Sequence, residues 1–378
     1  MSKSFYSLGL MSGTSMDGVD ASIIQSNGET KYKLILDKYF EYTADIFQDL
    51  TKLRYKINSS KDLKIFSKEV KNIEKKITLF NARAVNEILK KTKVKVDFLG
   101  FHGQTIYHDV RKKISKQLGD GKLLSKLTKK TVVYDFRRND LKNGGQGAPL
   151  TPIFHALIAF KHKLIPPNIF INIGGITNMT YLGSQIIGES GSVGTEWSAH
   201  DLCLGNCLID QWIRTHSKKN FDKDGKIALS GKINNSVLTH ALNNYYESKL
   251  FWGQNKSLDT RDFDLSFVRG LSLKDGAATL TEYTANILAR SLEEYSKSFS
   301  SKIILTGGGR KNNFLIRRLR EKSHYTVMLI DDYGIDGDFV ESQAFAYLAI
   351  RSYLKLPISF PETTGTKKPL TGGIIVNN

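Results

Sequence analysis

Short apolar blocks separated by polar turns mark the first part of the chain. An apolar run over 5–11 leads into polar residues 12–15, and a second apolar run covers 19–24. We expect two antiparallel strands joined by a tight turn. The same pattern predicts further strands at 32–42, 96–101, 131–134, 168–173, 179–182 and 302–306.

A helical period appears between these strands. Apolar residues recur three or four positions apart within 61–91, which predicts a long amphipathic helix with its lysines turned to water. A coiled coil is the alternative, but the apolar stripe runs directly into the next strand, which favours a helix packed on a sheet. Other helices are expected to open at Pro149, at Cys207, near Ala277 and at Val340. Alternating strands and helices predict an α/β protein.

Composition bounds the size and the class. A chain of 378 residues exceeds the usual single-domain range, so we expect two domains. No apolar run approaches the roughly 18 residues of a membrane span, and no basic-then-apolar signal pattern opens the sequence. We therefore expect a cytoplasmic protein with no membrane partner.

The formal charge of +18 raises the question of nucleic-acid binding. The lysines are spread along the whole chain instead of gathering with aromatic residues into a patch, so we expect no nucleic-acid partner. A basic surface can still attract anionic substrates such as ATP or an acidic sugar.

Cysteine usage is sparse. Cys203 and Cys207 are the two cysteines, too few for a disulfide framework. With His200 they make only a weak zinc pattern, because a structural zinc site needs four good ligands. Two buried thiols one helical turn apart are the preferred interpretation.

The turn of the first hairpin has the chemistry of a phosphate site. Gly13 and Gly18 permit positive φ, and hydroxyls and backbone N–H groups near Ser15 can point at an anion. Asp17 can hold a hydrated cation beside that anion. An ordinary Gly/Asp turn is the alternative, and no Walker motif occurs in the chain. The candidate ATP-binding residues here are Gly13, Thr14, Ser15, Met16, Asp17, Gly18, Val19 and Asp20.

Two later glycine turns strengthen the phosphate interpretation. A second strand–turn–strand unit carries Gly174, Gly175, Thr177 and Asn178, roughly 160 positions after the first. Two such hairpins suit a nucleotide clamped between duplicated domains. A buried strand then delivers Gly307, Gly308 and Gly309 to a helix start, which suits a nucleoside lying on the backbone.

Polar residues that follow a buried strand form a candidate substrate site. His102, Gly103, Gln104 and Thr105 come after the strand at 96–101, and ligands of α/β proteins bind at the carboxyl edge of the sheet. A capping or packing role is the alternative for His102. The neighbouring Gly103 and Gln104 favour a ligand contact.

A second polar run offers cations. Arg137 and Arg138 can clamp a carboxylate or phosphate, or can form ion pairs with Asp135 and Asp140. The glycine run 144–147 suits a hinge or a close approach of backbone to ligand.

Two acidic residues stand near predicted helix starts. Asp201 is either an N-cap or, at the end of the second hairpin unit, a general base. Glu341 is either a first-turn acid favoured by the helix dipole or a ligand group. The run 222–226 begins like a calcium loop but lacks the later ligands, so we expect a turn there.

Taken together, these stretches resemble the anhydro-N-acetylmuramic acid kinases of bacterial cell-wall recycling. The matching runs occur in the family's order and span almost the whole chain. They are 9–20, 102–105, 135–138, 144–149, 172–178, 307–309 and 341–349.

The resemblance implies a two-domain ATPase fold of the actin, Hsp70 and sugar-kinase type, with ATP and Mg²⁺ in a cleft between duplicated halves. Domain I would comprise 1–140 plus 340–378, and domain II 141–339. Asp201 corresponds by motif position to the base that activates water, and Asp17 is the candidate for Mg²⁺ through a water. Substrate contacts are assigned to His102, Gly103, Gln104, Thr105, Asp120, Arg137 and Glu341.

The implied reaction opens the anhydro bridge of 1,6-anhydro-N-acetylmuramic acid by attack of water at the anomeric carbon. The freed 6-oxygen takes the γ-phosphoryl group of ATP, which gives N-acetylmuramic acid 6-phosphate. The family is commonly dimeric, although no apolar stripe in this chain identifies an interface.

One stretch departs from the family. Asp-Thr-Gly-Pro-Gly-Asn is usual where this chain has Asp201-Leu-Cys-Leu-Gly-Asn206. Loss of the Thr hydroxyl and of a flexible Gly can change how Asp201 is oriented. This departure motivates an alternative function, a sensor that binds ATP and sugar without efficient turnover. A kinase of the same fold for another substrate is disfavoured by the runs 102–105 and 144–149.

Overall fold

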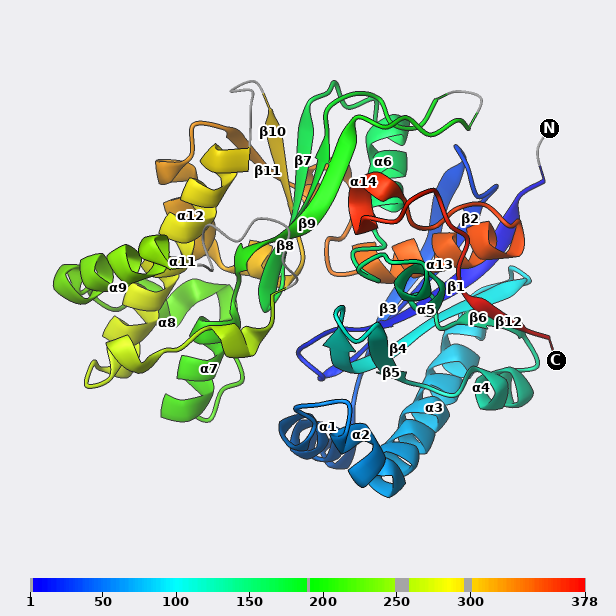
Figure 1. The fold of residues 1–378 in the computed structure, drawn as a ribbon, viewed down its shortest axis with the longest axis horizontal. Coiled ribbons are helices and arrows are strands. Elements are labelled where there is room, and N and C mark those ends of the chain that lie inside the picture. Colours follow the sequence, from blue (N-terminus) through cyan, green and yellow to red (C-terminus); the bar gives the residue numbers. More distant parts are fainter. Residues whose placement is uncertain (1–2, 189–190, 249–257, 296–300, 378) are drawn as a thin grey trace. The chain divides into compact units, whose positions relative to one another are not determined.

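The computed structural model describes residues 3–188, 191–248, 258–295 and 301–377. The chain forms two compact units, each built around its own sheet (Figure 1). Unit 1 comprises Met1–Leu164, Gln185–Trp197 and Phe339–Asn378, and unit 2 comprises Ile165–Ser184 and Ser198–Asp338. Residues 141–164, which the sequence analysis assigned to domain II, therefore belong to unit 1. Gln185–Trp197, also expected in domain II, falls in unit 1 as well.

The sheet of unit 1 begins with the expected three-stranded meander. Strands β1 and β2 pair antiparallel, β2 and β3 pair antiparallel, and β4 lies parallel to both β1 and β6. The order across the sheet is β12-β6-β4-β1-β2-β3, with β5 paired to β4. The strands are β1 Phe5–Ser12, β2 Gly18–Ser26, β3 Tyr32–Glu41, β4 Phe98–Asp109, β5 Ile114–Leu118, β6 Thr131–Tyr134 and β12 Ile374–Val376.

Helices cover this sheet and connect its strands. The helices of unit 1 are α1 Ala44–Lys56, α2 Asp62–Ile65, α3 Ser67–Leu89, α4 Gly121–Thr128, α5 Arg138–Lys142, α6 Pro152–Lys161, α13 Val340–Tyr353 and α14 Pro361–Thr364. The single long helix expected over 61–91 is interrupted at Phe66, whose ψ of 23° lies outside the helical range. The helix expected to open at Pro149 begins at Pro152 instead. Proline is favoured at the first position of a helix, so the sequence alone does not distinguish between the two prolines.

The sheet of unit 2 has the order β11-β10-β7-β8-β9. Its strands are β7 Asn168–Ile173, β8 Ile176–Leu182, β9 Trp197–Leu204, β10 Lys302–Thr306 and β11 Thr326–Leu329. Its helices are α7 Cys207–His216, α8 Lys226–Leu229, α9 Asn235–Glu247, α11 Leu273–Tyr295 and α12 Asn313–Lys322, joined in places by short 3₁₀ turns. Helix α11 packs against α7, α8, α9 and α12 (Figure 1).

The two sheets repeat one plan. In unit 1 the order β3-β2-β1-β4-β6 has an antiparallel β1–β2 pair followed by parallel β1–β4 and β4–β6 pairs. In unit 2 the order β9-β8-β7-β10-β11 has an antiparallel β7–β8 pair followed by parallel β7–β10 and β10–β11 pairs. The chain is therefore an internal structural duplication, as the paired glycine hairpins predicted.

Glycines on β1 and β4 allow helix α13 to lie directly on the sheet of unit 1. A Cβ atom on Gly9 would stand 1.9 Å from the Ser342 carbonyl oxygen, and one on Gly100 would stand 2.2 Å from that of Phe345. Successive residues of a strand face opposite sides, so the neighbouring Leu8 and other apolar residues fill the core beneath α1 and α3. Gly9 is therefore required by close packing.

None of the described helices combines the length and apolar character needed to cross a membrane.

Candidate active site

The first hairpin turn, between β1 and β2, is anchored from two neighbouring strands. The Ser12 hydroxyl lies 2.9 Å from the hydroxyl of Tyr42, which follows β3. From β4, Nε2 of Gln104 donates to the Gly13 carbonyl at 2.8 Å. Thr14 and Ser15 stay exposed at the tip. Tyr42 and Gln104 thus fix the turn, while the hydroxyls and N–H groups at its tip remain accessible to a ligand.

The glycines of this turn act differently from the expectation. Neither Gly13 nor Gly18 has positive φ, and Met16 takes the left-handed conformation instead, with φ 60°. A Cβ on Gly18 would lie 2.5 Å from the Phe40 carbonyl oxygen, so β3 requires this glycine. At Gly13 a Cβ would meet only the Ser15 hydroxyl, at 3.8 Å. The fold itself does not demand glycine at position 13, which points to a ligand that passes close to it.

Asp17 has the position and chemistry expected of a cation ligand. Its carboxylate is exposed at the tip and accepts a hydrogen bond from the Ser15 hydroxyl at 2.6 Å. No cluster of three or more metal-ligating side chains occurs in the described ranges. Mg²⁺ in nucleotide sites is usually held by one or two carboxylates, waters and phosphate oxygens, so a single exposed carboxylate fits this ion.

In unit 2, three glycine turns converge at the carboxyl ends of β7 and β10. The Gly174 and Gly175 carbonyls accept hydrogen bonds from the backbone N–H groups of Asn206 and Gly205, at 2.8 and 2.9 Å. A Cβ on Gly205 would stand 2.3 Å from the Gly174 oxygen. The loop after β9 is therefore docked on the Gly-Gly turn, and this contact requires a glycine at position 205.

The three consecutive glycines divide into two kinds. Gly307 has φ 76°, and a Cβ there would stand 2.1 Å from Oδ1 of Asn172; a Cβ on Gly309 would stand 2.2 Å from the Ile173 side chain. Gly308 is exposed, has no positive φ, and a Cβ there would meet nothing within 4 Å. Packing explains the outer two glycines. Packing does not explain Gly308. Because Gly308 has no side chain, a ligand can lie directly against the backbone of the turn there.

Thr177, expected to bind phosphate, is fully buried. Its hydroxyl donates to the Leu204 carbonyl at 3.1 Å. The side chain therefore supports the β9–α7 loop from within unit 2. Asn178 is partly exposed on β8.

Asp201 lies inside strand β9, not at a helix start. Helix α7 begins only at Cys207, with Asn206 before it, so the N-cap alternative for Asp201 is wrong. The carboxylate is partly exposed, and its Oδ2 accepts the backbone N–H of Leu258 at 2.9 Å. A strand and a backbone hydrogen bond thus orient this carboxylate, as a positioned base requires.

The residues that depart from the family pattern lie in the core of unit 2. Leu202 is 7 % exposed, and Cys203 and Leu204 are fully buried. Three apolar residues complete β9 at the positions where the family pattern has Thr-Gly-Pro, and α7 begins at Cys207, as the sequence predicted. Burial raises the pKa of Cys207 to about 12 and also raises that of Cys203, so both thiols stay protonated.

In unit 1, β4 extends past its parallel pairing with β6 and carries the whole His-Gly-Gln-Thr run. The run was expected to follow the strand at 96–101. It lies within β4 instead, because β5 pairs with β4 from Gln104 onward. Gly103 has φ 76°, and a Cβ there would stand 2.4 Å from the Leu118 carbonyl oxygen. Thr105 accepts a hydrogen bond from Gln117.

The two arginines after β6 have different partners. Arg138 is exposed and pairs with Asp135 at 2.5 Å. Arg137 instead donates from Nη2 to Nε2 of His102 at 2.8 Å and from Nη1 to the Gly147 carbonyl at 2.8 Å. The ion-pair alternative is thus realised by Arg138, and the anion clamp stays a prediction for Arg137.

Two further candidates lie in the same unit. Glu341 stands in the first turn of α13; burial raises the pKa of its carboxyl, and the Arg137 charge opposes that rise. Asp120 is the N-cap of α4 and accepts the Leu123 N–H at 3.0 Å, so its side chain has a structural task.

Sequence analysis missed an arginine clamp behind the Gly307–Gly309 turn. Arg310 is 3 % exposed and pairs with Asp331, Asp336 and Asp338 at 2.6, 2.9 and 2.5 Å. Its Nη1 also donates to the Gly307 carbonyl at 3.0 Å. The signal available was an arginine directly after the glycines and a cluster of four aspartates within 331–338.

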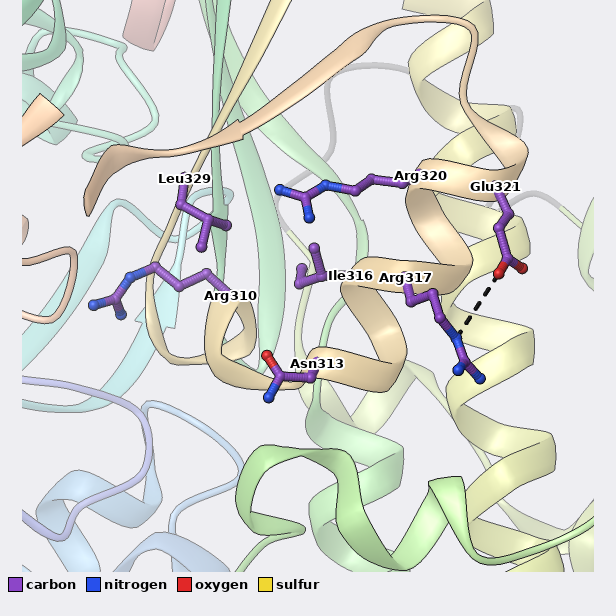
Figure 2. Close-up of a pocket in the computed structure, with 7 residues that line it drawn as sticks. All are labelled: Arg310, Asn313, Ile316, Arg317, Arg320, Glu321 and Leu329. Atoms are coloured by element: carbon purple, nitrogen blue, oxygen red, sulfur yellow. Dashed lines mark ion pairs between the residues drawn. The ribbon is translucent and has the colours of Figure 1, made fainter. Parts of the chain in front are cut away.

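Beside this clamp lies an open pocket of about 480 Å³ between α12 and β11 (Figure 2). It is lined by Arg310, Asn313, Ile316, Arg317, Arg320, Glu321 and Leu329. Three aspartates balance Arg310, and Glu321 pairs with Arg317 at 3.8 Å. The third arginine of the lining, Arg320, donates to the Val327 carbonyl at 3.3 Å. We assign no function to this pocket, and the glycine turns remain the candidate nucleotide site.

The duplicated sheets, with a glycine turn at the end of the first hairpin of each, define a two-domain ATPase of the actin, Hsp70 and sugar-kinase class. The sequence model of the anhydro-N-acetylmuramic acid kinase family matches residues 5–378. The chain belongs to this family.

Curated relatives match over almost their whole length. An anhydro-N-acetylmuramic acid kinase from Pelagibacter ubique is 50 % identical over 100 % of both chains. One from Agrobacterium fabrum is 37 % identical over 98 % of both, and one from Zymomonas mobilis is 38 % identical over 97 % of this chain and 98 % of its own.

Solved structures show more distant likenesses. An activator of 2-hydroxyisocaproyl-CoA dehydratase from Clostridium difficile with bound ADPNP aligns over 92 % of this chain and 94 % of its own, at 12 % identity and a TM-score of 0.43. A ROK family glucokinase from Streptomyces griseus in complex with glucose and AMPPNP aligns over 91 % and 99 %, at 13 % identity and a TM-score of 0.40.

Proposed function

We propose that the chain is the ATP-dependent kinase that converts 1,6-anhydro-N-acetylmuramic acid into N-acetylmuramic acid 6-phosphate, a step of peptidoglycan recycling. The observation that carries this proposal is the family match over residues 5–378, together with a relative that is 50 % identical along its full length. No observation favours the sensor alternative, because the departing residues after Asp201 pack in the core and leave its carboxylate partly exposed.

ATP is assigned to the glycine turns. The tip of the unit 1 hairpin, with Gly13, Thr14 and Ser15, offers exposed hydroxyls and backbone N–H groups to phosphate. In unit 2 the Gly174-Gly175 turn offers a second phosphate contact, and the open space over Gly308 accepts the nucleoside. Among the remaining first-hairpin candidates, Met16 takes the left-handed conformation within the turn, Gly18 packs against β3, and Val19 and Asp20 lie in β2.

Mg²⁺ is assigned to Asp17, through water. When bound there, the ion would neutralise charge on the β- and γ-phosphates of ATP.

The sugar contacts that unit 1 supplies are assigned to the residues around Arg137 and Glu341. Arg137 supplies a cation and Glu341 a carboxyl group, while Gly103, Gln104 and Thr105 continue the same strand past His102. An amino sugar that bears a lactyl carboxylate requires such a mixture of cationic and neutral polar groups.

Asp201 is the proposed base. Its ionised carboxylate takes a proton from a water while the water oxygen bonds to the anomeric carbon. The bond between that carbon and the 6-oxygen breaks, and the 6-oxygen bonds to the γ-phosphorus as ADP leaves. The hydrogen bond from Leu258 N–H fixes the carboxylate without protonating it.

ATP and a released anhydro-sugar meet in the cytoplasm, so we place the protein there. Its partner is then a small molecule, and a homodimer is consistent with the family.

Purified protein incubated with ATP, Mg²⁺ and the anhydro-sugar tests this function. We expect stoichiometric ADP and a sugar 6-phosphate by mass spectrometry. ADP that forms at the same rate without the sugar, or bound ATP and sugar with no product, would contradict the proposal.

A further inference from the structure

The side-chain amide of Gln104 connects strand β4 to the turn of the first hairpin. Gln104 is 1 % exposed, and its Nε2 donates to the Gly13 carbonyl at 2.8 Å. A carbonyl can only accept, so this contact also determines which end of the amide faces the turn. At the other end, Oε1 is buried and has no hydrogen-bond partner among the described residues. Within that part of the chain, the Gln104 side chain is therefore hydrogen-bonded to the turn alone.

An irregularity in β4 lies directly before this glutamine. Between two paired positions, β1 advances by two residues, 10–12, while β4 advances by three, 101–104. Gly103, with φ 76°, lies in the longer stretch. An extra residue bends a strand and changes the direction of the side chain that follows it. The bulge therefore accounts for how Gln104 reaches the turn from a neighbouring strand.

The stability of the fold does not explain a glutamine at this position. A buried amide oxygen without a partner costs more free energy than one neutral hydrogen bond contributes. A buried apolar side chain of similar length, such as methionine, would avoid that cost. What the amide adds is its hydrogen bond to Gly13, so we look for its role in the geometry of the turn.

The Gly13 carbonyl determines where the next backbone N–H points. The peptide bond between Gly13 and Thr14 is trans, and in a trans peptide the carbonyl and the N–H point to opposite sides. Gln104 holds the carbonyl toward β4, so the Thr14 N–H points away from β4 at the exposed tip. None of the described residues accepts a hydrogen bond from this N–H. An outward backbone N–H on a turn is a suitable donor to a phosphate oxygen.

We propose that Gln104 is a positioning residue for ATP, because it holds the Gly13 carbonyl and thereby directs the Thr14 N–H at a phosphate oxygen. The inference rests on the proposed function, since that function places the phosphates of ATP at this turn. It moves Gln104 from the sugar contacts, where the sequence placed it, to the nucleotide. A donor that is already oriented binds phosphate without first losing conformational freedom.

ATP titration of two methionine variants tests this role. Gln104→Met keeps the length of the side chain and removes the donor. Gln343→Met is the matched control, because Gln343 is also buried in unit 1 and its Nε2 donates to Asp37 at 2.9 Å. We expect the Kd for ATP to rise about tenfold in Gln104→Met, the usual scale for a hydrogen bond to a charged group. Gln343→Met should bind ATP like the wild type, even where it melts at a lower temperature.

Steady-state kinetics separate a role toward the nucleotide from a role toward the sugar. In Gln104→Met we expect KM for ATP to rise about tenfold, while KM for the anhydro-sugar stays within about twofold of the wild-type value. A rise in KM for the sugar with an unchanged Kd for ATP would make Gln104 a sugar contact and would overturn the proposal. Equal losses of ATP affinity in Gln104→Met and Gln343→Met would overturn it as well.

A double-mutant cycle decides whether Gln104 acts through the Thr14 N–H. The Gly13 carbonyl accepts the Met16 N–H at 3.3 Å, so Thr14 occupies the second position of a β-turn, where proline is favoured. Thr14→Pro removes the N–H within that geometry, and Thr14→Ala removes only the hydroxyl. We expect Thr14→Pro to bind ATP about tenfold more weakly than Thr14→Ala.

The two Thr14 backgrounds then give opposite expectations for the same change. Gln104→Met should cause its full loss of ATP affinity in the Thr14→Ala background and no additional loss in the Thr14→Pro background. A full loss in both backgrounds would show that Gln104 acts in another way and would overturn the proposal. The comparison of Gln104→Met with Gln343→Met does not depend on the proline variant.

The proposed function fails separately. A wild-type protein that forms no sugar 6-phosphate, but whose ATP affinity depends on Gln104 as expected, would contradict the kinase and leave this inference intact. Formation of the product together with an ATP affinity that Gln104→Met does not change would overturn this inference alone.

Discussion

Asp201 shows at the residue scale how far a single side chain could be assigned from sequence. Its identity came from the motif, but its setting did not, because only the structure shows that Asp201 lies within β9 and accepts the backbone N–H of Leu258. Thr177 was placed at the phosphate by its neighbours, whereas its hydroxyl supports the Leu204 carbonyl. Side-chain direction along a strand depends on register, which the sequence shows only after the partners are known.

Replacement of Asp201 tests its role as base. Asp201→Asn keeps the shape and the acceptor for Leu258 N–H but loses the negative charge that takes a proton. We expect kcat to fall on the order of a thousandfold, while the Kd for ATP stays within a few fold of the wild type. Steady-state kinetics and nucleotide titration measure the two quantities.

The matched control is Asp224→Asn, which removes a carboxylate paired with Lys226 on a turn of unit 2. Its kcat should equal that of the wild type. If Asp201→Asn mainly weakened ATP binding, Asp201 would be a structural residue of the unit 2 loop.

At the scale of elements, strands and long helices were predictable because the repeat of apolar residues persists over many positions. The strands at 131–134, 168–173 and 302–306 match β6, β7 and β10 in full. The break at Phe66 and the start of α6 at Pro152 were not predicted, since either depends on packing that local pattern does not encode. The role of each glycine could likewise be assigned only from the structure. A glycine needed for a positive φ, for close packing or for contact with a ligand looks the same in the sequence.

The Gly307–Gly309 turn permits a direct test of those roles. Gly308→Ala introduces a methyl group that meets no protein atom, so the free energy of unfolding should stay the same. The same methyl group occupies the proposed nucleoside position, and we expect ATP to bind about tenfold more weakly. Chemical denaturation and nucleotide titration check the two expectations.

Gly309→Ala is the counterpart within the same turn. Its Cβ would stand 2.2 Å from the Ile173 side chain, so unfolding should become easier by about 1–3 kcal/mol. Similar behaviour of the two variants would mean that Gly308 has no special relation to the nucleotide.

Buried neutral histidines give the whole molecule a defined acid sensitivity. Burial lowers the pKa of His155 in unit 1 to about 3 and that of His200 in unit 2 to about 4, from an ordinary 6.5. Between these values and 6.5 the unfolded chain binds more protons than the folded chain. Their contribution to stability is therefore complete above pH 6.5 and is lost as the pH falls toward 4.

We expect each histidine to cost about 2 kcal/mol of unfolding free energy between pH 7 and pH 5. Urea denaturation at both pH values measures this loss for each unit. His155→Gln and His200→Gln, which cannot titrate, should each reduce the pH dependence even where they lower stability at pH 7. An unchanged pH dependence in both variants would show that other groups dominate acid unfolding.

The duplicated plan of the molecule could be inferred from sequence because each half opens with the same strand–glycine turn–strand pattern. Two segments expected in domain II, residues 141–164 and 185–197, lie in the compact unit of β1 and α13. The anchors behind the turns, Gln104 and Arg310, emerged only once residues distant in sequence were brought together.

The central claim is that this protein opens an anhydro-sugar with water and phosphorylates the oxygen that is released. Its most direct test is the reaction with ATP, Mg²⁺ and 1,6-anhydro-N-acetylmuramic acid in ¹⁸O-labelled water, analysed by mass spectrometry soon after mixing. The account predicts N-acetylmuramic acid 6-phosphate with one labelled oxygen at the anomeric carbon and none in the phosphate. Product whose label lies in the phosphate, or product without label, would contradict it.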